Sequence, residues 1–238
     1  MIAGRGINTE LQGNVADKSF VRNYNEYVIR PQPIDYVLSF FDNKKEGTFI
    51  DIGAYDGVKW SNSLVLEEEL GWEGVCIEAN VNSYEKCEGL RSSITLNKAV
   101  CSAFDDVTFR NVIGGASCLS CIVEFVEKKH LQRINSEIEK LGGSYTDVSV
   151  ETITLNEIFD KFVKGNSVDY LSIDAEGSEY EIFKNFNFDI YSCSLISVEY
   201  NGSLGESERD SDSKVTTLLK NNGYKPICKV AGDLFFSK

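Results

Sequence analysis

A short apolar run followed by two spaced glycines places the strongest constraint on how this chain can fold. Residues Thr48–Ile52 predict a buried strand, Gly53 predicts an abrupt turn, and residues 61–70 have the character of a helix. A strand, a glycine turn and a helix in this order form the first half of a nucleotide-binding βαβ unit. Because glycine has no Cβ, the backbone at this turn can bend sharply and a ligand can approach the peptide plane.

Strand-like and helix-like segments continue to alternate after this unit. Further strands are predicted at residues 75–78, 94–100, 168–173 and 194–198, with helices between them. This alternation is typical of a parallel, doubly wound α/β sheet. Two closing strands, at residues 224–230 and 233–236, are joined at Ala231 and Gly232 and predict an antiparallel pair.

The length of 238 residues is most simply explained by a single α/β domain with a lead-in. We expect the lead-in, with its own helix, over residues 1–46 and the main domain over residues 47–238. Residues 111–147 interrupt the alternation with a glycine loop and a charged helical segment. Such an insertion is expected near the substrate side of a pocket. The chain could also be a domain cut from a longer polypeptide.

The charge and composition of the chain exclude several classes of partner. A formal net charge of −13 argues against a nucleic-acid partner, because binding to phosphates requires clustered Lys and Arg side chains. No apolar run approaches the length that spans a membrane, and the N-terminus lacks the apolar core of a signal peptide. The seven scattered cysteines are typical of reduced thiols. These features predict an intracellular, cytoplasmic protein.

The acidic residues around the glycine turn discriminate between cofactors. Gly53 and Gly57 are separated by three residues, which does not match the G-x-G-x-x-G pattern of NAD-binding turns. Asp51 at the strand end and Asp56 in the turn would repel a pyrophosphate, but they suit a ligand with a cationic amino group. Glu78 ends the next strand, where a carboxylate can accept hydrogen bonds from ribose hydroxyls. Together these residues favour S-adenosyl-L-methionine over NAD.

Acidic residues also end the later predicted strands. Asp51, Glu78, Asp174 and Glu199 each stand at a strand end. Because ligands bind beyond the carboxyl ends of the strands in an open parallel sheet, these four side chains are expected to meet at one edge. Clustered carboxylates repel one another unless a cation lies among them, so this pattern predicts a site for a cationic ligand.

Several segments, in the same order along the chain, resemble the FkbM-type methyltransferases. They are residues 49–57, 60–62, 71–78, 97–100, 152–155, 169–179 and 196–201. The resemblance covers residues 47–236, which is nearly the whole folded part. Two positions depart from the usual pattern, since Tyr55 stands where Asn is usual and Ala79 stands where Pro is usual.

This resemblance implies a fold, an activity and a set of contacts. The fold is a single-domain, Rossmann-like class I methyltransferase sheet, mostly parallel with an antiparallel C-terminal strand pair. The activity is S-adenosyl-L-methionine-dependent O-methylation of a hydroxyl on a sugar or glycan. Asp51 and Gly53 are expected to hold the methionine part, Asn62 its carboxylate and Glu78 the ribose. The full set of expected cofactor contacts is Asp51, Gly53, Ala54, Tyr55, Gly57, Asn62, Glu78, Ala79, Ala99, Val100 and Asp174.

A sugar hydroxyl is a poor nucleophile, so it must lose its proton during methyl transfer. Two routes for the proton remain open. In the first, Asp174, Glu199 and Asn201 hold a divalent cation, and oxygen-only ligands favour Mg²⁺ or Mn²⁺. In the second, Asp174, Glu176 or His130, the only histidine, acts as a general base.

Two other functions compete with this hypothesis. The first is a catalytically inactive scaffold that binds S-adenosyl-L-methionine, but such a protein would not need both Asp174 and Glu199. The second is an NAD-dependent sugar-modifying enzyme, for which Tyr180 and Lys184 have the spacing of a Tyr-x-x-x-Lys pair. The glycine pattern that NAD requires is missing, which disfavours the second.

Overall fold

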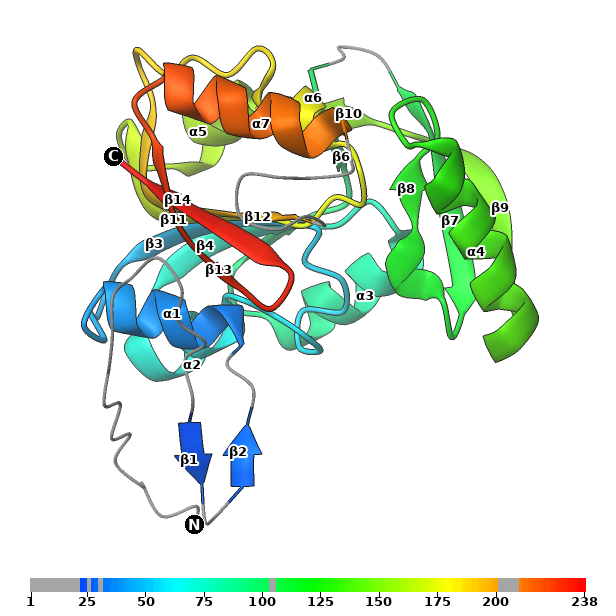
Figure 1. Cartoon of the computed structure of the whole chain (residues 1–238), viewed down its shortest axis with the longest axis horizontal. Helices are drawn as coiled ribbons and strands as arrows, with labels where there is room; N and C mark the ends of the chain where they lie inside the picture. The colour runs from blue at the N-terminus through cyan, green and yellow to red at the C-terminus, as the bar shows by residue number, and fades with distance from the viewer. Residues whose placement is uncertain (1–21, 25–26, 30–31, 103–105, 201–209) are drawn as a thin grey trace.

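A seven-stranded sheet forms the centre of the computed structural model, which describes residues 22–24, 27–29, 32–102, 106–200 and 210–238 (Figure 1). The strand order is β13-β14-β12-β11-β3-β4-β5. These strands are β3 (Thr48–Ile52), β4 (Glu73–Ile77), β5 (Ile94–Leu96), β11 (Ser167–Ile173), β12 (Ser192–Glu199), β13 (Lys225–Val230) and β14 (Asp233–Ser237). All neighbours from β12 to β5 are parallel, whereas β14 is antiparallel to both β12 and β13. The predicted class I sheet with its antiparallel closing pair is therefore confirmed.

Helices cover both faces of this sheet. One layer contains α1 (Pro33–Phe40), α2 (Leu64–Leu70) and α3 (Val81–Leu90), and the other contains α5 (Leu155–Phe162), α6 (Glu179–Phe183) and α7 (Asp210–Asn221) (Figure 1). Because side chains alternate along a strand, Phe49 of β3 packs in the first layer, while Ile50 and Ile52 pack in the second. Asp51 therefore faces the first layer, toward α2 and α3.

Capping side chains define where the helices nearest the sheet edge begin. Asn80 caps α3, since its Oδ1 accepts hydrogen bonds from the backbone N–H groups of Asn82 (3.0 Å) and Ser83 (3.3 Å). Thr154 and Glu157 form a reciprocal capping box at the start of α5. Asparagine and threonine are typical capping residues. These two caps fix the first turns of α3 and α5, which follow β4 and β10 (Thr152–Ile153) in the chain.

A smaller unit stands beside the main sheet (Figure 1). Its three antiparallel strands are β7 (Val107–Gly114), β8 (Cys121–Ile122) and β9 (Gly143–Val150), and it also contains η1 (Ser117–Leu119) and α4 (Lys128–Leu141). Buried Ile134 of α4 packs against Val112 and Leu119. We call residues 107–150 the side unit. The predicted insertion at residues 111–147 lies within it, and the predicted charged helix begins later than expected because Cys121 and Ile122 pair with β7.

Two short strand pairs complete the described chain. They are β1 (Arg22–Tyr24) with β2 (Tyr27–Ile29), and β6 (Ala99–Val100) with β10 (Thr152–Ile153). The single strand predicted over residues 94–100 is wrong, because it divides into β5 and β6 around Asn97. The Asn97 side-chain amide donates to the carbonyl oxygens of Glu78 (2.8 Å) and Ala79 (3.1 Å), which brings β6 to the end of β4.

The helix of the predicted lead-in packs on the main sheet. Tyr36, Val37 and Leu38 of α1 are buried in the same cluster as Phe49, and the Tyr36 and Phe235 rings lie 4.7 Å apart. The division between residues 46 and 47 stays a prediction. Among the described helices, none combines the length and apolar character needed to cross a bilayer.

Candidate active site

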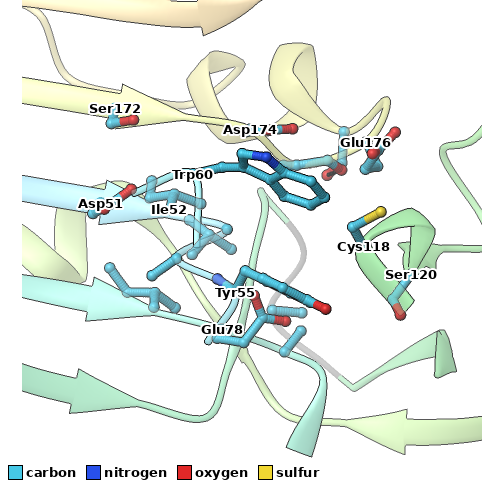
Figure 2. A pocket seen from close by; sticks show the side chains of 18 of the residues that line it. Asp51, Ile52, Tyr55, Trp60, Glu78, Cys118, Ser120, Ser172, Asp174 and Glu176 are labelled. Carbon is cyan, nitrogen blue, oxygen red and sulfur yellow. Dashed lines mark hydrogen bonds between the residues drawn. The ribbon is translucent and has the colours of Figure 1, made fainter. Parts of the chain in front are cut away.

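A cavity of about 300 Å³ opens where β3, β4 and β11 end (Figure 2). Four parts of the chain line it, one of which is the segment at residues 98–100 that contains β6. The strand ends contribute Asp51, Glu78 and Asp174, and the turn after β3 contributes residues 53–55 and 59–62. The side unit contributes Phe109, Ser117, Cys118, Ser120, Ile122 and Arg133. The cavity therefore lies at the edge that the strand-end carboxylates predicted.

Gly53 allows β3 and β11 to approach each other at this edge. Its backbone φ is +82°, and a Cβ at this position would lie 1.8 Å from the carbonyl oxygen of Asp174. The Gly53 N–H donates to the Ile77 carbonyl oxygen (2.9 Å), and the Asp174 N–H donates to the Ile52 carbonyl oxygen (3.0 Å). Only glycine fits both the left-handed backbone and this close contact.

Asp51 is buried in a polar network that joins three elements. The Ser63 hydroxyl donates to Asp51 Oδ2 (2.5 Å), and the Arg91 guanidinium donates to Ser63 Oγ (3.1 Å) and to the Gly57 carbonyl oxygen (3.1 Å). Burial raises the pKa of Asp51, although Ser63 and Arg91 oppose the shift. Arg91 also pairs with Glu67 of α2 (3.0 Å) and so fixes the whole turn between β3 and α2.

Glu78 accepts two backbone hydrogen bonds at the end of β4, next to β3. The N–H groups of Tyr55 (2.8 Å) and Asn80 (2.7 Å) donate to its two carboxylate oxygens. Burial nevertheless raises the pKa of Glu78 to about 7. Because each carboxylate oxygen has two lone pairs, both oxygens can still accept a bond from a ligand hydroxyl.

Three carboxylates gather at the ends of β11 and β12. Oxygen atoms of Asp174, Glu176 and Glu199 all lie within 4.8 Å of one another. The Asp174 side chain is exposed to the cavity, but protein atoms surround its carboxyl. This desolvation, with the Glu199 and Glu176 charges, raises the pKa of Asp174 well above its usual value. Asn201, the third predicted metal ligand, lies outside the described residues, and Glu176 provides the third oxygen of this cluster.

His130 of α4 contacts the acidic cluster through Glu176. A carbonyl oxygen can only accept, so His130 Nε2 carries the proton that it donates to the Leu119 oxygen (3.0 Å). His130 Nδ1 then faces Glu176 Oε2 at 3.5 Å, and Arg133 Nη1 lies 3.9 Å from the same oxygen. The side unit is thereby connected to the carboxylates at the end of β11.

Most of the predicted site residues are brought together by the fold. Those that line the cavity are Asp51, Gly53, Ala54, Tyr55, Asn62, Glu78, Ala79, Ala99, Val100, Asp174 and Glu176. Of the predicted residues that the structure describes, Gly57, Glu199 and His130 are not in this lining. A Cβ on Gly57 would meet Arg91 and Cys87, so this glycine serves the packing of α3 against the turn.

Asp56 has a different role from the one expected. Its Oδ1 accepts hydrogen bonds from the backbone N–H groups of Val58 (3.1 Å) and Lys59 (2.7 Å). Asp56 thus shapes the backbone of its own turn, and it does not line the cavity. The expectation that Asp56 faces a cationic ligand is therefore wrong.

Asp233 does not line the cavity, but it contacts the lining residue Asn62, and sequence reasoning missed it. Asn62 Nδ2 donates to Asp233 Oδ2 (3.1 Å), and Asp233 pairs with Glu199 in the sheet register. Burial and the Glu199 charge raise the pKa of Asp233 to about 7. Because β14 runs antiparallel to β12, it begins at the edge of the sheet where β12 ends. Asp233 is the first residue of the predicted closing strand, so the sequence already indicated that it lies at this edge.

The strand order, the antiparallel closing pair and a cavity at the carboxyl ends of the strands define a Rossmann-like class I methyltransferase fold. Residues 51–226 match the family described as the methyltransferase FkbM domain. Because this match covers most of the chain, the protein belongs to the FkbM methyltransferase family, whose members use S-adenosyl-L-methionine. None of the curated proteins compared with the chain matches it.

Solved structures that are similar to this chain include three methyltransferase-fold proteins. A SAM-dependent methyltransferase from Aquifex aeolicus has 12% identity, with 86% of this chain and 87% of that chain covered and a TM-score of 0.39. A precorrin-6y C5,15-methyltransferase from Geobacter metallireducens has 12% identity, coverage of 91% and 91%, and a TM-score of 0.40. Aeropyrum pernix fibrillarin with natively bound S-adenosyl-L-methionine has 10% identity, coverage of 92% and 82%, and a TM-score of 0.40.

Proposed function

We propose that this protein is an S-adenosyl-L-methionine-dependent O-methyltransferase that acts on a hydroxyl of a sugar or glycan. One observation carries the proposal. A single cavity connects Glu78 and the turn after β3 with Asp174 and Glu176, which belong to the acidic cluster. We call Glu78 and the turn after β3 the first wall, and Asp174 and Glu176 with the adjoining residues of the side unit the second wall. A methyl donor bound at the first wall and a hydroxyl bound at the second would meet beside groups that can take up a proton.

The residues of the first wall fit the proposed cofactor. When bound, S-adenosyl-L-methionine supplies a methyl group on a positively charged sulfur. Burial raises the pKa of both Asp51 and Glu78, so a cationic ligand would stabilise their charged forms. Small side chains at Ala79 and Ala99, together with Val100, leave an apolar surface for a flat ring. Glu78 retains acceptor capacity for ribose hydroxyls.

The acidic cluster fits the removal of the hydroxyl proton. Transfer forms a bond between the acceptor oxygen and the methyl carbon and breaks the carbon–sulfur bond, so the hydroxyl proton must leave. Glu176 lines the cavity with His130 Nδ1 3.5 Å behind it, and this pair can receive a proton and pass it on. The same three carboxylates offer an oxygen-only ligand set that would suit Mg²⁺ or Mn²⁺.

The second wall supports a neutral, hydroxyl-rich acceptor. Ser117 and Glu176 place a hydroxyl and a carboxylate along it, and both can form hydrogen bonds with acceptor hydroxyls. The Ser120 hydroxyl is already saturated, since it donates to the Ser117 carbonyl oxygen and accepts from Val112 and Asn80.

The carboxylates repel a phosphate, but Lys59, Lys98 and Arg133 line the same cavity and would attract one, so the case for a neutral acceptor depends on Ser117 and Glu176. The absence of a nucleic-acid partner stays a prediction from the net charge.

Calorimetric titration with S-adenosylhomocysteine tests the cofactor, with NAD as the parallel control. We expect micromolar binding of S-adenosylhomocysteine and no binding of NAD. Failure of S-adenosylhomocysteine to bind would contradict the proposed function. Binding without methyl transfer from labelled S-adenosyl-L-methionine to any of a panel of glycans would instead favour an inactive scaffold.

A chelator separates the two proton routes once transfer is measured. If the cluster holds a divalent cation, chelation lowers the rate, and Mg²⁺ or Mn²⁺ restores it. Full activity in excess chelator would assign proton removal to a protein base, namely Asp174, Glu176 or His130. A calorimetric titration with the chelator present provides the control, because cofactor binding does not require the cluster to hold a metal.

A further inference from the structure

Trp60 has no role in the fold that explains its conformation. Its side chain is 66% exposed, more than any other large apolar side chain in the described chain, and it lines the cavity. Its backbone φ is +61°, a left-handed conformation that costs a bulky residue about 1–2 kcal/mol. The exposure of the indole and its strained backbone both lower the stability of the folded protein. A functional role therefore accounts for an indole at this position better than a structural one.

The turn holds Trp60 firmly in this conformation. Before it, Asp56 Oδ1 accepts the N–H groups of Val58 and Lys59. After it, Ser61 Oγ accepts from the buried Arg91 guanidinium (3.3 Å), and the Ser61 N–H donates to the Val58 carbonyl oxygen (3.3 Å). The indole is therefore presented by a fixed backbone at the mouth of the cavity.

Tyr55 supports the indole from within the site. The Tyr55 and Trp60 rings stack with centroids 6.1 Å apart and an interplanar angle of 26° (Figure 2). The Tyr55 hydroxyl lies 2.9 Å from Ser117 Oγ, and its backbone N–H is bound to Glu78. Tyr55 thus connects the indole to both the side unit and the wall proposed for the ribose.

The contact between Lys59 and Trp60 shows which chemistry the indole attracts. Lys59 Nζ lies 3.9 Å from the indole centroid, where the negative face of an aromatic ring binds a positively polarised group. The C–H bonds on one face of a pyranose ring are polarised in the same sense. Lys59 has an exposed, flexible side chain, so a sugar ring can displace its ammonium group from the face of the indole. The displaced ammonium group can then donate a hydrogen bond to a hydroxyl of that sugar.

We infer that Trp60, supported by Tyr55, is the platform on which the pyranose ring of the acceptor stacks. This inference rests on the proposed function and extends it to a specificity-determining residue. The apolar face of the sugar lies on the indole, and its hydroxyl edge faces Glu176 in the same cavity. In the view of Figure 2, Asp174 and Glu176 lie beyond the indole, on the side away from Tyr55.

The two tryptophans of the chain make this platform measurable. Trp72 is only 2% exposed, and its indole N–H donates to the Lys44 carbonyl oxygen, so a soluble quencher reaches Trp60 alone. The probes are methyl glycosides of common hexoses, added to protein saturated with S-adenosylhomocysteine. We expect at least one glycoside to protect Trp60 from the quencher. The Trp60→Phe variant, in which Trp72 alone emits, gives the baseline.

Substitution at Trp60 tests the same site without relying on fluorescence. Trp60→Asn should fold at least as well as the original chain, because asparagine tolerates a positive φ. We expect about a tenfold rise in KM for the protecting glycoside, with the affinity for S-adenosylhomocysteine unchanged, and a smaller rise for Trp60→Phe. Ile190→Asn removes another exposed apolar side chain, at the far end of β12, and should alter neither quantity.

The outcomes separate this inference from the proposed function. Absence of S-adenosylhomocysteine binding to the original chain defeats the proposed function itself. If S-adenosylhomocysteine binds but no glycoside protects Trp60, or only a nucleoside control does, the platform is overturned while the cofactor assignment stands. Weaker S-adenosylhomocysteine binding by Trp60→Asn, with an unchanged KM, would make the indole a cofactor contact and would also overturn it.

Discussion

Glu78 shows how a single buried residue can be prepared for a ligand. Two backbone N–H groups hold its carboxylate in place, yet burial raises its pKa to about 7. The Glu78 carboxylate is thus held in one orientation, and its oxygens can still accept hydrogen bonds from a ligand. A ligand with two vicinal hydroxyls would supply those donors and stabilise the charged form.

Replacing Glu78 tests this role. We expect Glu78→Gln to weaken S-adenosylhomocysteine binding by about 1–3 kcal/mol, because charge-assisted hydrogen bonds to the ribose are lost. Calorimetry provides the measurement. Glu73→Gln, at the opposite and exposed end of β4, is the matched control and should bind normally. Equal affinities for the two variants would remove Glu78 from the cofactor site.

Which individual residues could be predicted depends on what fixes their position. Asp51, Glu78 and Asp174 were placed correctly at the cavity because the carboxyl end of a parallel strand has a defined location. Arg91 is far from the turn in sequence and reaches it only through the packing of α3, so no local pattern indicated it. Tyr55 has a φ of +50°, a left-handed conformation that asparagine adopts more readily than tyrosine.

At the scale of elements, the contact between the ends of β3 and β11 shapes the site. Gly53→Ala would combine a strained φ with a Cβ 1.8 Å from a backbone oxygen. We expect the free energy of unfolding to fall by about 3 kcal/mol or more, as measured by denaturant titration.

Gly71 provides the control for this substitution. Its φ is +69°, but a Cβ would meet nothing within 4 Å. Gly71→Ala should therefore show the backbone strain alone, about 1 kcal/mol. Similar losses for the two variants would mean that β11 moves away from Gly53 at little cost.

The main sheet was more predictable than the side unit for a physical reason. Strands such as β3 and β11 are buried on both faces along most of their length, so they appear in the sequence as short runs rich in apolar residues. By contrast, β9 is exposed along nearly its whole length and begins at a glycine, and only its pairing with β7 makes it a strand. Pairing between distant segments leaves little trace in local sequence.

At the scale of the whole molecule, buried carboxylates in and beside the cavity have raised pKa values in the folded state. Glu78 and Asp233 have pKa values of about 7 in the folded protein, against ordinary values of 4.5 and 3.8. Between those limits the folded state holds more protons than the unfolded state, so stability falls as the pH rises. Glu67 behaves oppositely, because hydrogen bonds from Ser93, Ser92 and Arg91 outweigh its burial and lower its pKa to about 2.

We therefore expect the ligand-free protein to be most stable near pH 4.5 and to lose roughly 1–3 kcal/mol by pH 7. Denaturant titrations across this range provide the measurement. Asp233→Asn should reduce the decrease in the free energy of unfolding above pH 4.5. Glu67→Gln should change only the increase in this free energy as the pH rises toward 4.5. A stability that increases steadily from pH 4.5 to pH 7 would show that the buried carboxyls are not protonated as described.

The cavity has walls of two different origins, and this has a consequence for how such enzymes diversify. The strand ends continue the strands of the main sheet, whose apolar side chains form the core, so insertions and large changes there disturb the sheet. The side unit, by contrast, has its own three-stranded sheet and contributes Phe109, Ser117 and Cys118 to the cavity from outside the main sheet. Substitutions at its cavity-facing positions would leave the main sheet intact. A lineage could thus acquire new acceptors by drift at these positions while it inherits its methyl donor unchanged.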